Sequence, residues 1–112
     1  AVLCAVSQTL REHAREVDRV ARFGGEEFCL LLPKTLHEGA VLAAERLRHA
    51  IAQIEVPWLD EVIRVTISTG LATSQGHEEA LSALLRRADE ALYRAKAEGR
   101  NRVVCAPVLQ LA

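Results

Sequence analysis

Two adjacent carboxylates follow two glycines in residues 22–28, whose sequence is Arg-Phe-Gly-Gly-Glu-Glu-Phe. Glycine adopts positive φ without strain and lets a ligand approach the backbone, so Gly24 and Gly25 predict a two-residue hairpin turn between short strands. Mg²⁺ prefers one or two carboxylates together with substrate phosphates, which makes Glu26 and Glu27 candidate metal ligands. From spacing alone, a hairpin with two solvated acids at its tip is the more economical interpretation.

Two other groups of charged residues have spacings that suit binding. Lys96 and Arg100 lie four residues apart at the end of a predicted helix, where the helix dipole by itself favours cations. Arg15 and Asp18 lie three residues apart, shortly before the glycines. They form either a surface ion pair or a site in which the guanidinium grips a phosphate and the carboxylate accepts hydrogen bonds from a base.

These residues must be positioned by a small set of helices and strands. Apolar residues recur at three- and four-residue steps in three segments, which predicts helices over residues 2–17, 35–54 and 78–98. Apolar runs and alternation predict strands over residues 20–23, 28–32, 62–72 and 102–106. The resulting order, αββαβαβ, indicates an α+β sheet with helices packed on it.

Local signals define several of these elements further. Thr35 and Glu38 match a capping box at the start of the second helix, and Gly99 is placed to end the third. Five consecutive apolar residues over 28–32 predict an inner strand covered on both faces. Trp58, in the linker after the second helix, is interpreted as a partly buried anchor.

Composition bounds the class of protein. The chain has 112 residues and a formal net charge of −1, so we expect one domain without the basic field that a nucleic-acid polymer requires. No apolar run approaches the ~20 residues of a membrane span, and we expect no membrane contact by this segment. Three cysteines without a Cys-x-x-Cys motif predict buried free thiols in a reducing compartment. Four histidines without metal-ligand spacing are interpreted as surface residues, and the absence of methionine predicts a longer parent protein.

The glycine-carboxylate stretch is accompanied by further recognisable motifs along the chain. Residues 24–28 match the signature of the GGDEF family, the diguanylate cyclases, in its GGEEF form. Other stretches that resemble family landmarks follow in the family's order, at Arg15-x-x-Asp18 and at residues 44–48, 65–70, 88–96 and 99–102. The sequence therefore resembles this family over nearly its whole length.

The resemblance implies a palm-like, mainly antiparallel sheet packed by helices, similar to nucleotidyl cyclases. It implies one domain over residues 1–112, truncated on its N-terminal side. In the family, a preceding strand and helical hairpin carry a metal-binding Asp and the residues that read guanine. Because that strand is central in the family sheet, its removal would expose two apolar strand edges.

The resemblance also implies an activity: two GTP molecules, one on each domain of an antiparallel homodimer, condense to cyclic di-GMP with release of two pyrophosphates. Mg²⁺ or Mn²⁺ is implied as the cofactor. The implied roles are catalysis and metal binding for Glu26 and Glu27, substrate binding for Gly24, Gly25, Lys96 and Arg100, and product inhibition for Arg15 and Asp18, with Arg46 as a secondary contact.

Two alternatives stay open at this point. The domain could be a module that binds cyclic di-GMP or GTP as a regulator, or a fragment without activity of its own. An N-terminal sensor domain is expected in the parent, and the cytoplasm is the expected location whether or not the parent is anchored to a membrane. Asp89 and Tyr93 are assigned to structure, with Tyr93 packing against its neighbours.

Overall fold

The computed structural model describes residues 2–15, 18–23, 27–74 and 79–107. Within them, the helices are α1 (Val2–His13), α2 (His37–Ala52) and α3 (Leu81–Ala97). The strands are β1 (Arg19–Phe23), β2 (Glu27–Leu31), β3 (Val56–Trp58), β4 (Glu61–Ile63), β5 (Thr69–Leu71) and β6 (Val103–Cys105). The described strands form three pairs, of which β1–β2 and β3–β4 are antiparallel and β5–β6 is parallel. The predicted series of elements is present, but the strand expected over 62–72 is divided into β4 and β5, and β3 is an addition.

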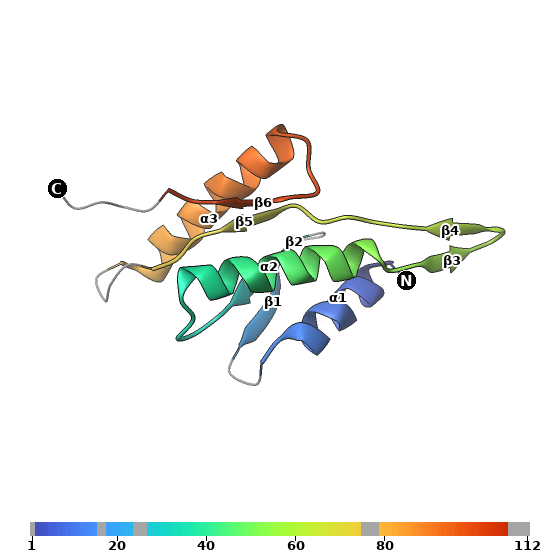
Figure 1. Cartoon of the computed structure of the whole chain (residues 1–112), viewed down its shortest axis with the longest axis horizontal. Coiled ribbons are helices and arrows are strands. Elements are labelled where there is room, and N and C mark those ends of the chain that lie inside the picture. The colour runs from blue at the N-terminus through green and yellow to red at the C-terminus, as the bar shows by residue number, and fades with distance from the viewer. Residues whose placement is uncertain (1, 16–17, 24–26, 75–78, 108–112) are drawn as a thin grey trace.

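Helix α2 lies between α1 and the β5–β6 pair (Figure 1) and contributes to two apolar clusters. At one end of α2, Leu47 and Ile51 pack with Val6 and Leu10 of α1, and side chains of the β1–β2 hairpin lie against them. At the other end, Ala40 and Ala44 pack against Leu71 of β5. The predicted buried stripe of this helix is therefore confirmed, because its apolar face must cover both clusters.

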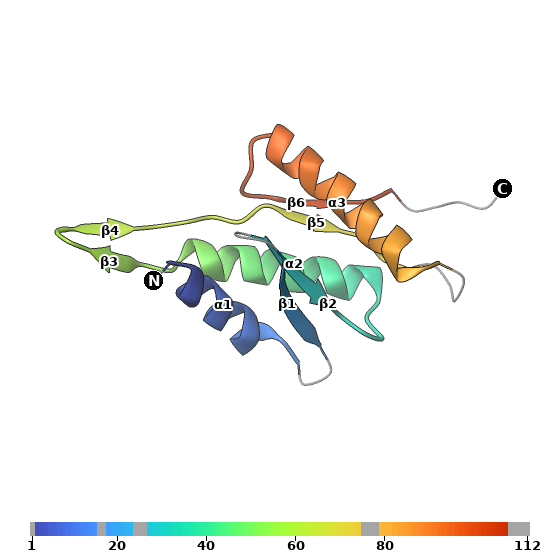
Figure 2. The same ribbon diagram turned by 180° about the vertical axis from the view of Figure 1, so that it is seen from behind.

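Helix α3 packs closely on the parallel pair, as both views of the ribbon show (Figures 1 and 2). Gly70 of β5 permits this approach, since a Cβ at that position would overlap backbone atoms of Ala88 and Leu92. The helix ends as predicted at Gly99, which has φ +121°. The Arg100 N–H donates to the Ala95 carbonyl at 2.9 Å, the long-range hydrogen bond of a Schellman ending.

The predicted helix boundaries need correction: α3 begins at Leu81 rather than at residue 78, and α1 and α2 differ from the prediction for one shared reason. Helix α1 ends at His13 rather than at residue 17, because the Arg15 N–H donates to the Asp18 carboxylate at 2.7 Å instead of to a helical carbonyl. Helix α2 has Leu36 at its N-cap position without a side-chain cap, so the capping box is not formed. The Thr35 hydroxyl donates instead to the Pro33 carbonyl at 3.1 Å and accepts a hydrogen bond from Arg15. In both cases a hydrogen bond that involves a side chain outside the helix forms in place of a bond to the helix backbone.

The strand predictions need two corrections as well. Strand β2 pairs with β1 alone among the described strands and is half-buried, so it is not an inner strand covered on both faces. The β3–β4 ribbon extends away from the other elements (Figure 2), and Trp58 on it is 59% exposed rather than partly buried. Within the described residues, β2 and β5 also lie in separate pairs. A further strand between them remains a prediction.

Candidate functional site

The carboxylate stretch lies at the closed end of the β1–β2 hairpin. Phe23 pairs with Glu27 across the hairpin, and the predicted two-residue turn falls in the stretch between them. Gly24, Gly25 and Glu26 lie outside the described residues. Of the predicted site in this stretch, the structure therefore places Glu27 at the first position of β2.

Glu27 lies beside the last turn of α3. Its Oε1 is 3.7 Å from Nζ of Lys96, and the two side chains are 54% and 40% exposed. A surface ion pair at this distance contributes little stability, because water screens both charges. The contact nevertheless brings a predicted metal ligand and a predicted phosphate ligand together from opposite ends of the chain.

Arg100 follows Lys96 on the loop after α3, and this loop has an unusual backbone. Arg100 and Asn101 have φ +64° and +46°, in the left-handed region that non-glycine residues rarely occupy. The Arg100 side chain is exposed, and its carbonyl accepts a hydrogen bond from Nε of Arg102 at 3.0 Å. The cationic end of α3 is thus open to solvent while its backbone is held.

Arg15 and Asp18 form a closed network rather than a simple surface pair. Arg15 donates to both carboxylate oxygens of Asp18, with Nη2–Oδ1 at 3.0 Å and Nε–Oδ1 at 3.2 Å. The same Nη2 donates to the Pro33 carbonyl at 3.1 Å and to Oγ1 of Thr35 at 2.5 Å. The Asp18 side chain is 3% exposed, whereas that of Arg15 is 53% exposed.

This geometry assigns different tasks to the two residues. The hydrogen bond from Arg15 lowers the pKa of the Asp18 carboxyl below its ordinary value, although burial acts in the opposite direction. The buried carboxylate holds the half-exposed guanidinium in place. The role of Asp18 as a hydrogen-bond acceptor for a base stays a prediction.

Arg46 lies on the exposed side of α2, apart from this network. It lines an open hollow of about 430 Å³ between α1 and α2, together with His13, Leu42, Glu45, His49 and Ala50. Its placement agrees with the expectation that Arg46 serves a neighbouring domain, which stays a prediction. His37, in contrast, is not a free surface residue, because its ring Nδ1 lies 2.8 Å from Oγ1 of Thr73.

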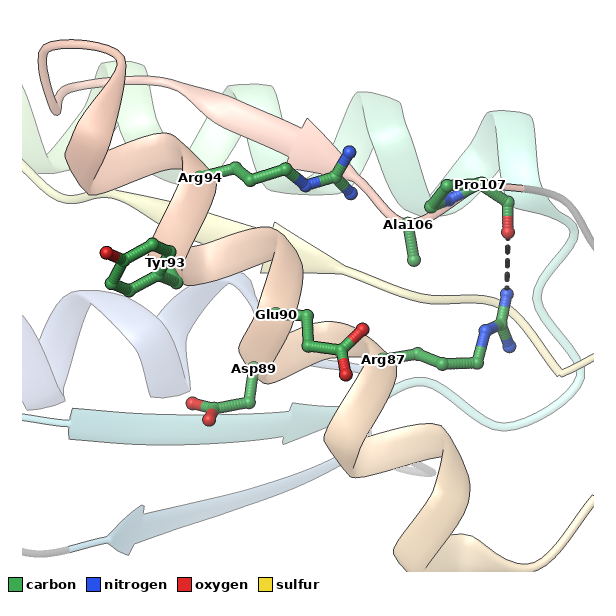
Figure 3. A pocket seen from close by; sticks show the side chains of 7 residues that line it. All are labelled: Arg87, Asp89, Glu90, Tyr93, Arg94, Ala106 and Pro107. Atoms are coloured by element: carbon green, nitrogen blue, oxygen red, sulfur yellow. Dashed lines mark hydrogen bonds between the residues drawn. The ribbon is translucent and has the colours of Figure 1, made fainter.

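A second hollow, of about 570 Å³, is lined by α3 and by the residues that follow β6. Figure 3 shows Arg87 and Arg94 extending from this helix toward Ala106 and Pro107. Arg87 donates to Glu79 at 2.9 Å and to the Pro107 carbonyl at 3.2 Å, a network that no local spacing indicated. Tyr93 also lines this hollow and is largely exposed, so its predicted packing is wrong.

The described residues supply part of what a hard divalent cation requires. Among them, no group of three or more His, Cys, Asp or Glu side chains is placed to hold a metal ion. Glu27 offers an exposed carboxylate, and Mg²⁺ needs only one or two carboxylates when phosphates and water complete its shell. The donor chemistry therefore fits such an ion bound together with a substrate phosphate.

Comparison with known proteins agrees with this arrangement of elements. Residues 1–102 match the family described as "Diguanylate cyclase, GGDEF domain". The chain belongs to the GGDEF family. The recognition made from the GGEEF stretch is thereby confirmed, and so is the α+β fold class, because the structural neighbours are GGDEF domains.

Curated relatives in the family carry diguanylate cyclase names. The chain is 47% identical over 105 residues to diguanylate cyclase DgcM of Escherichia coli K12, covering 94% of the chain and 25% of the relative. It is 45% identical over 102 residues to diguanylate cyclase DgcP of Pseudomonas aeruginosa, covering 91% and 15% respectively. The GGDEF chain thus spans a quarter or less of the length of these relatives.

Solved GGDEF structures match in three dimensions. The GGDEF domain of DgcB from Caulobacter crescentus, in complex with c-di-GMP, gives a TM-score of 0.87 at 30% identity, over 94% of this chain and 63% of that chain. The active GGEEF domain of a diguanylate cyclase from Vibrio cholerae gives 0.85 at 29% identity, over 96% and 68%. Among the described residues, no helix has the length and apolar character needed to cross a membrane.

Proposed function

We propose that this GGDEF domain condenses two GTP molecules to cyclic di-GMP with release of two pyrophosphates. The observation that carries the proposal is the approach of Lys96 to Glu27, which places the cationic end of α3 beside the GGEEF hairpin. A triphosphate needs a cation for its terminal phosphates and carboxylates for its metal, and the Lys96–Glu27 contact brings both kinds of group together. The names of the curated relatives support the same enzyme class.

The residues have distinct tasks in this proposal. Lys96 and Arg100 hold the terminal phosphates and keep the triphosphate in one orientation. Glu26 and Glu27 would hold Mg²⁺ or Mn²⁺. Such an ion supplies charge neutralisation at the reacting phosphate. Gly24 and Gly25 leave room for the nucleotide beside the backbone. Each domain brings one GTP, so a homodimer is required.

The test is product formation by the full-length protein. Purified protein is incubated with GTP and Mg²⁺, and nucleotides are separated by anion exchange. Formation of cyclic di-GMP supports the proposal, and its loss in Glu27→Gln and Lys96→Met assigns the reaction to this site. A dimer that binds GTP and Mg²⁺ yet makes no product would overturn it.

We also propose that Arg15 binds the product and so limits the reaction. The observation behind this role is the closed network of Asp18, Pro33 and Thr35, which fixes a half-exposed guanidinium in one orientation. The DgcB domain described above, a family member, is in complex with c-di-GMP. Arg46 of a neighbouring domain would provide the second contact.

Arg15→Ala distinguishes this role from that of a pure receptor. An enzyme with product inhibition keeps its turnover in this variant and loses the inhibition. A regulatory module without turnover loses every response to cyclic di-GMP. We further propose that the full-length protein places this domain in the cytoplasm, after an N-terminal sensor domain. We also propose that a further strand of the full-length protein lies between β2 and β5.

A further inference from the structure

The loop that carries Arg100 adopts a backbone that needs external support. Gly99, Arg100 and Asn101 have φ +121°, +64° and +46°, three successive residues with positive φ. Glycine adopts such angles freely, and Asn is enriched among the few other residues that do, but Arg is not. Backbone of this kind persists where surrounding contacts determine it, and it clusters at functional sites.

Two local hydrogen bonds hold the backbone of Arg100. Its N–H donates to the Ala95 carbonyl at 2.9 Å, and its carbonyl accepts from Nε of Arg102 at 3.0 Å. Both polar groups of the Arg100 backbone are therefore bonded. A further hydrogen bond reaches the loop at Asn101.

The donor of this hydrogen bond is an arginine of helix α2. Nη1 of Arg48 donates to Oδ1 of Asn101 at 3.1 Å. The other edge of the same guanidinium is fixed by Glu45, with Nη2–Oε2 at 2.9 Å and Nε–Oε2 at 3.1 Å. Arg48 is thus oriented on its own helix before it reaches across to the loop, and a planar guanidinium transmits that orientation.

We propose that Glu45, Arg48 and Asn101 are positioning residues for the triphosphate of the substrate. They hold the loop after α3 in its left-handed conformation, so that Arg100 stays near the phosphate position beside Lys96. The inference rests on the proposed function, because it takes Arg100 as a phosphate ligand. A guanidinium held in place before binding needs less ordering when the phosphates arrive.

The experiment measures nucleotide binding and turnover separately in the full-length protein. Binding of a fluorescent GTP analogue gives affinity without chemistry, and GTP kinetics give KM and kcat. The variants are Asn101→Ala, Asn101→Asp and Arg48→Lys, with Arg100→Ala as the reference. Arg64→Gln is the matched control, because Arg64 forms a 2.8 Å exposed pair with Glu55 near the base of the β3–β4 ribbon, away from this loop.

We expect Asn101→Ala to weaken analogue binding and to raise KM, each about tenfold, because one charge-assisted hydrogen bond is lost. The kcat should stay within about twofold of wild type. Arg48→Lys should act in the same direction, because Lys lacks the planar fork that contacts both partners. Asn101→Asp should restore wild-type binding, since its carboxylate accepts from Arg48 and Asp tolerates the left-handed backbone. Arg64→Gln should change neither quantity.

Each contrary result has its own meaning. Wild-type affinity and KM in Asn101→Ala, with only a lower Tm, would overturn the inference and leave the network a purely structural tie. Unchanged affinity in Arg100→Ala would remove Arg100 from the phosphate site, and the inference would fall with it. If the protein makes no cyclic di-GMP but analogue binding follows the expected pattern, the proposed reaction fails and the positioning role stands.

Discussion

Two regions of this GGDEF domain hold their charges in opposite ways. In the Arg15 corner, defined by Arg15, Asp18, Pro33 and Thr35, the two charged groups are bonded to each other and the carboxylate is buried. At the Lys96 edge, defined by Glu27, Lys96 and Arg100, the side chains are exposed and the only ion pair described among them spans 3.7 Å.

The difference is expected to separate stability from activity. A buried carboxylate with several hydrogen bonds stabilises the fold, because removing it leaves donors without partners. An exposed pair at long range contributes about 0–1 kcal/mol, so its charges remain available to a ligand. The region around Arg15 is therefore suited to a site that keeps one geometry. The region around Lys96 is suited to a site at which substrate binds and product leaves.

The largest effect should come from Lys96→Met at the Lys96 edge. We expect cyclic di-GMP formation to fall at least about 100-fold, the cost of removing one charge-stabilising group from a reacting site. The Tm should move by less than about 2 °C, because the lost ion pair is exposed. Initial rates and a thermal melt of the same preparation measure both. Arg86→Met, an exposed change on the same helix, is the control, and full turnover in Lys96→Met would reverse the assignment.

Asp18→Ala should show the opposite pattern in the Arg15 corner. We expect the free energy of unfolding to fall by roughly 1–3 kcal/mol, because the backbone and side chain of Arg15 lose a charged acceptor. Turnover at low product concentration should persist, while product inhibition weakens. Denaturant titration and inhibition curves measure the two. The comparison between the regions would collapse if Glu27→Gln destabilised the protein as much.

Acid should remove the stabilisation that the Asp18 carboxylate gives to the wild-type protein. The Asp18 pKa is lowered in the folded state, so the unfolded chain binds the proton first as pH falls. The stabilisation is complete above the ordinary carboxyl pKa and is lost as pH falls through the lower folded value. We therefore expect the Tm difference between wild type and Asp18→Ala to be constant from pH 7 to about 5 and to shrink below about 4. A difference that grows on acidification would contradict this sign.

Thr35→Val should have the smallest effect, because it removes one neutral acceptor and leaves Asp18 in place. We expect a loss of about 0.5–1.5 kcal/mol in unfolding free energy and a few-fold weaker product inhibition. Thr35→Ser keeps the hydroxyl and should behave as wild type. Calorimetric binding of cyclic di-GMP to the three proteins gives the ranking, and equal affinity in all three would exclude Thr35 from the network's function.

Local sequence determined much of the fold. The apolar spacing of Ala40, Ala44, Leu47 and Ile51 fixed the buried face of α2, because helical periodicity depends only on near neighbours. Gly99 determined where α3 ends, since glycine alone reaches its φ without strain. The GGEEF stretch and its companions were sufficient to assign the family.

Only the tertiary structure decided which polar groups meet. Thr35 has the spacing of a helix cap, yet its hydroxyl serves Arg15, and Asp18 is buried although it lies in a charged segment. Lys96 meets Glu27, and Arg48 meets Asn101, across separations that no sequence period describes. A polar side chain binds the best partner within reach, and packing of distant elements determines which partners those are.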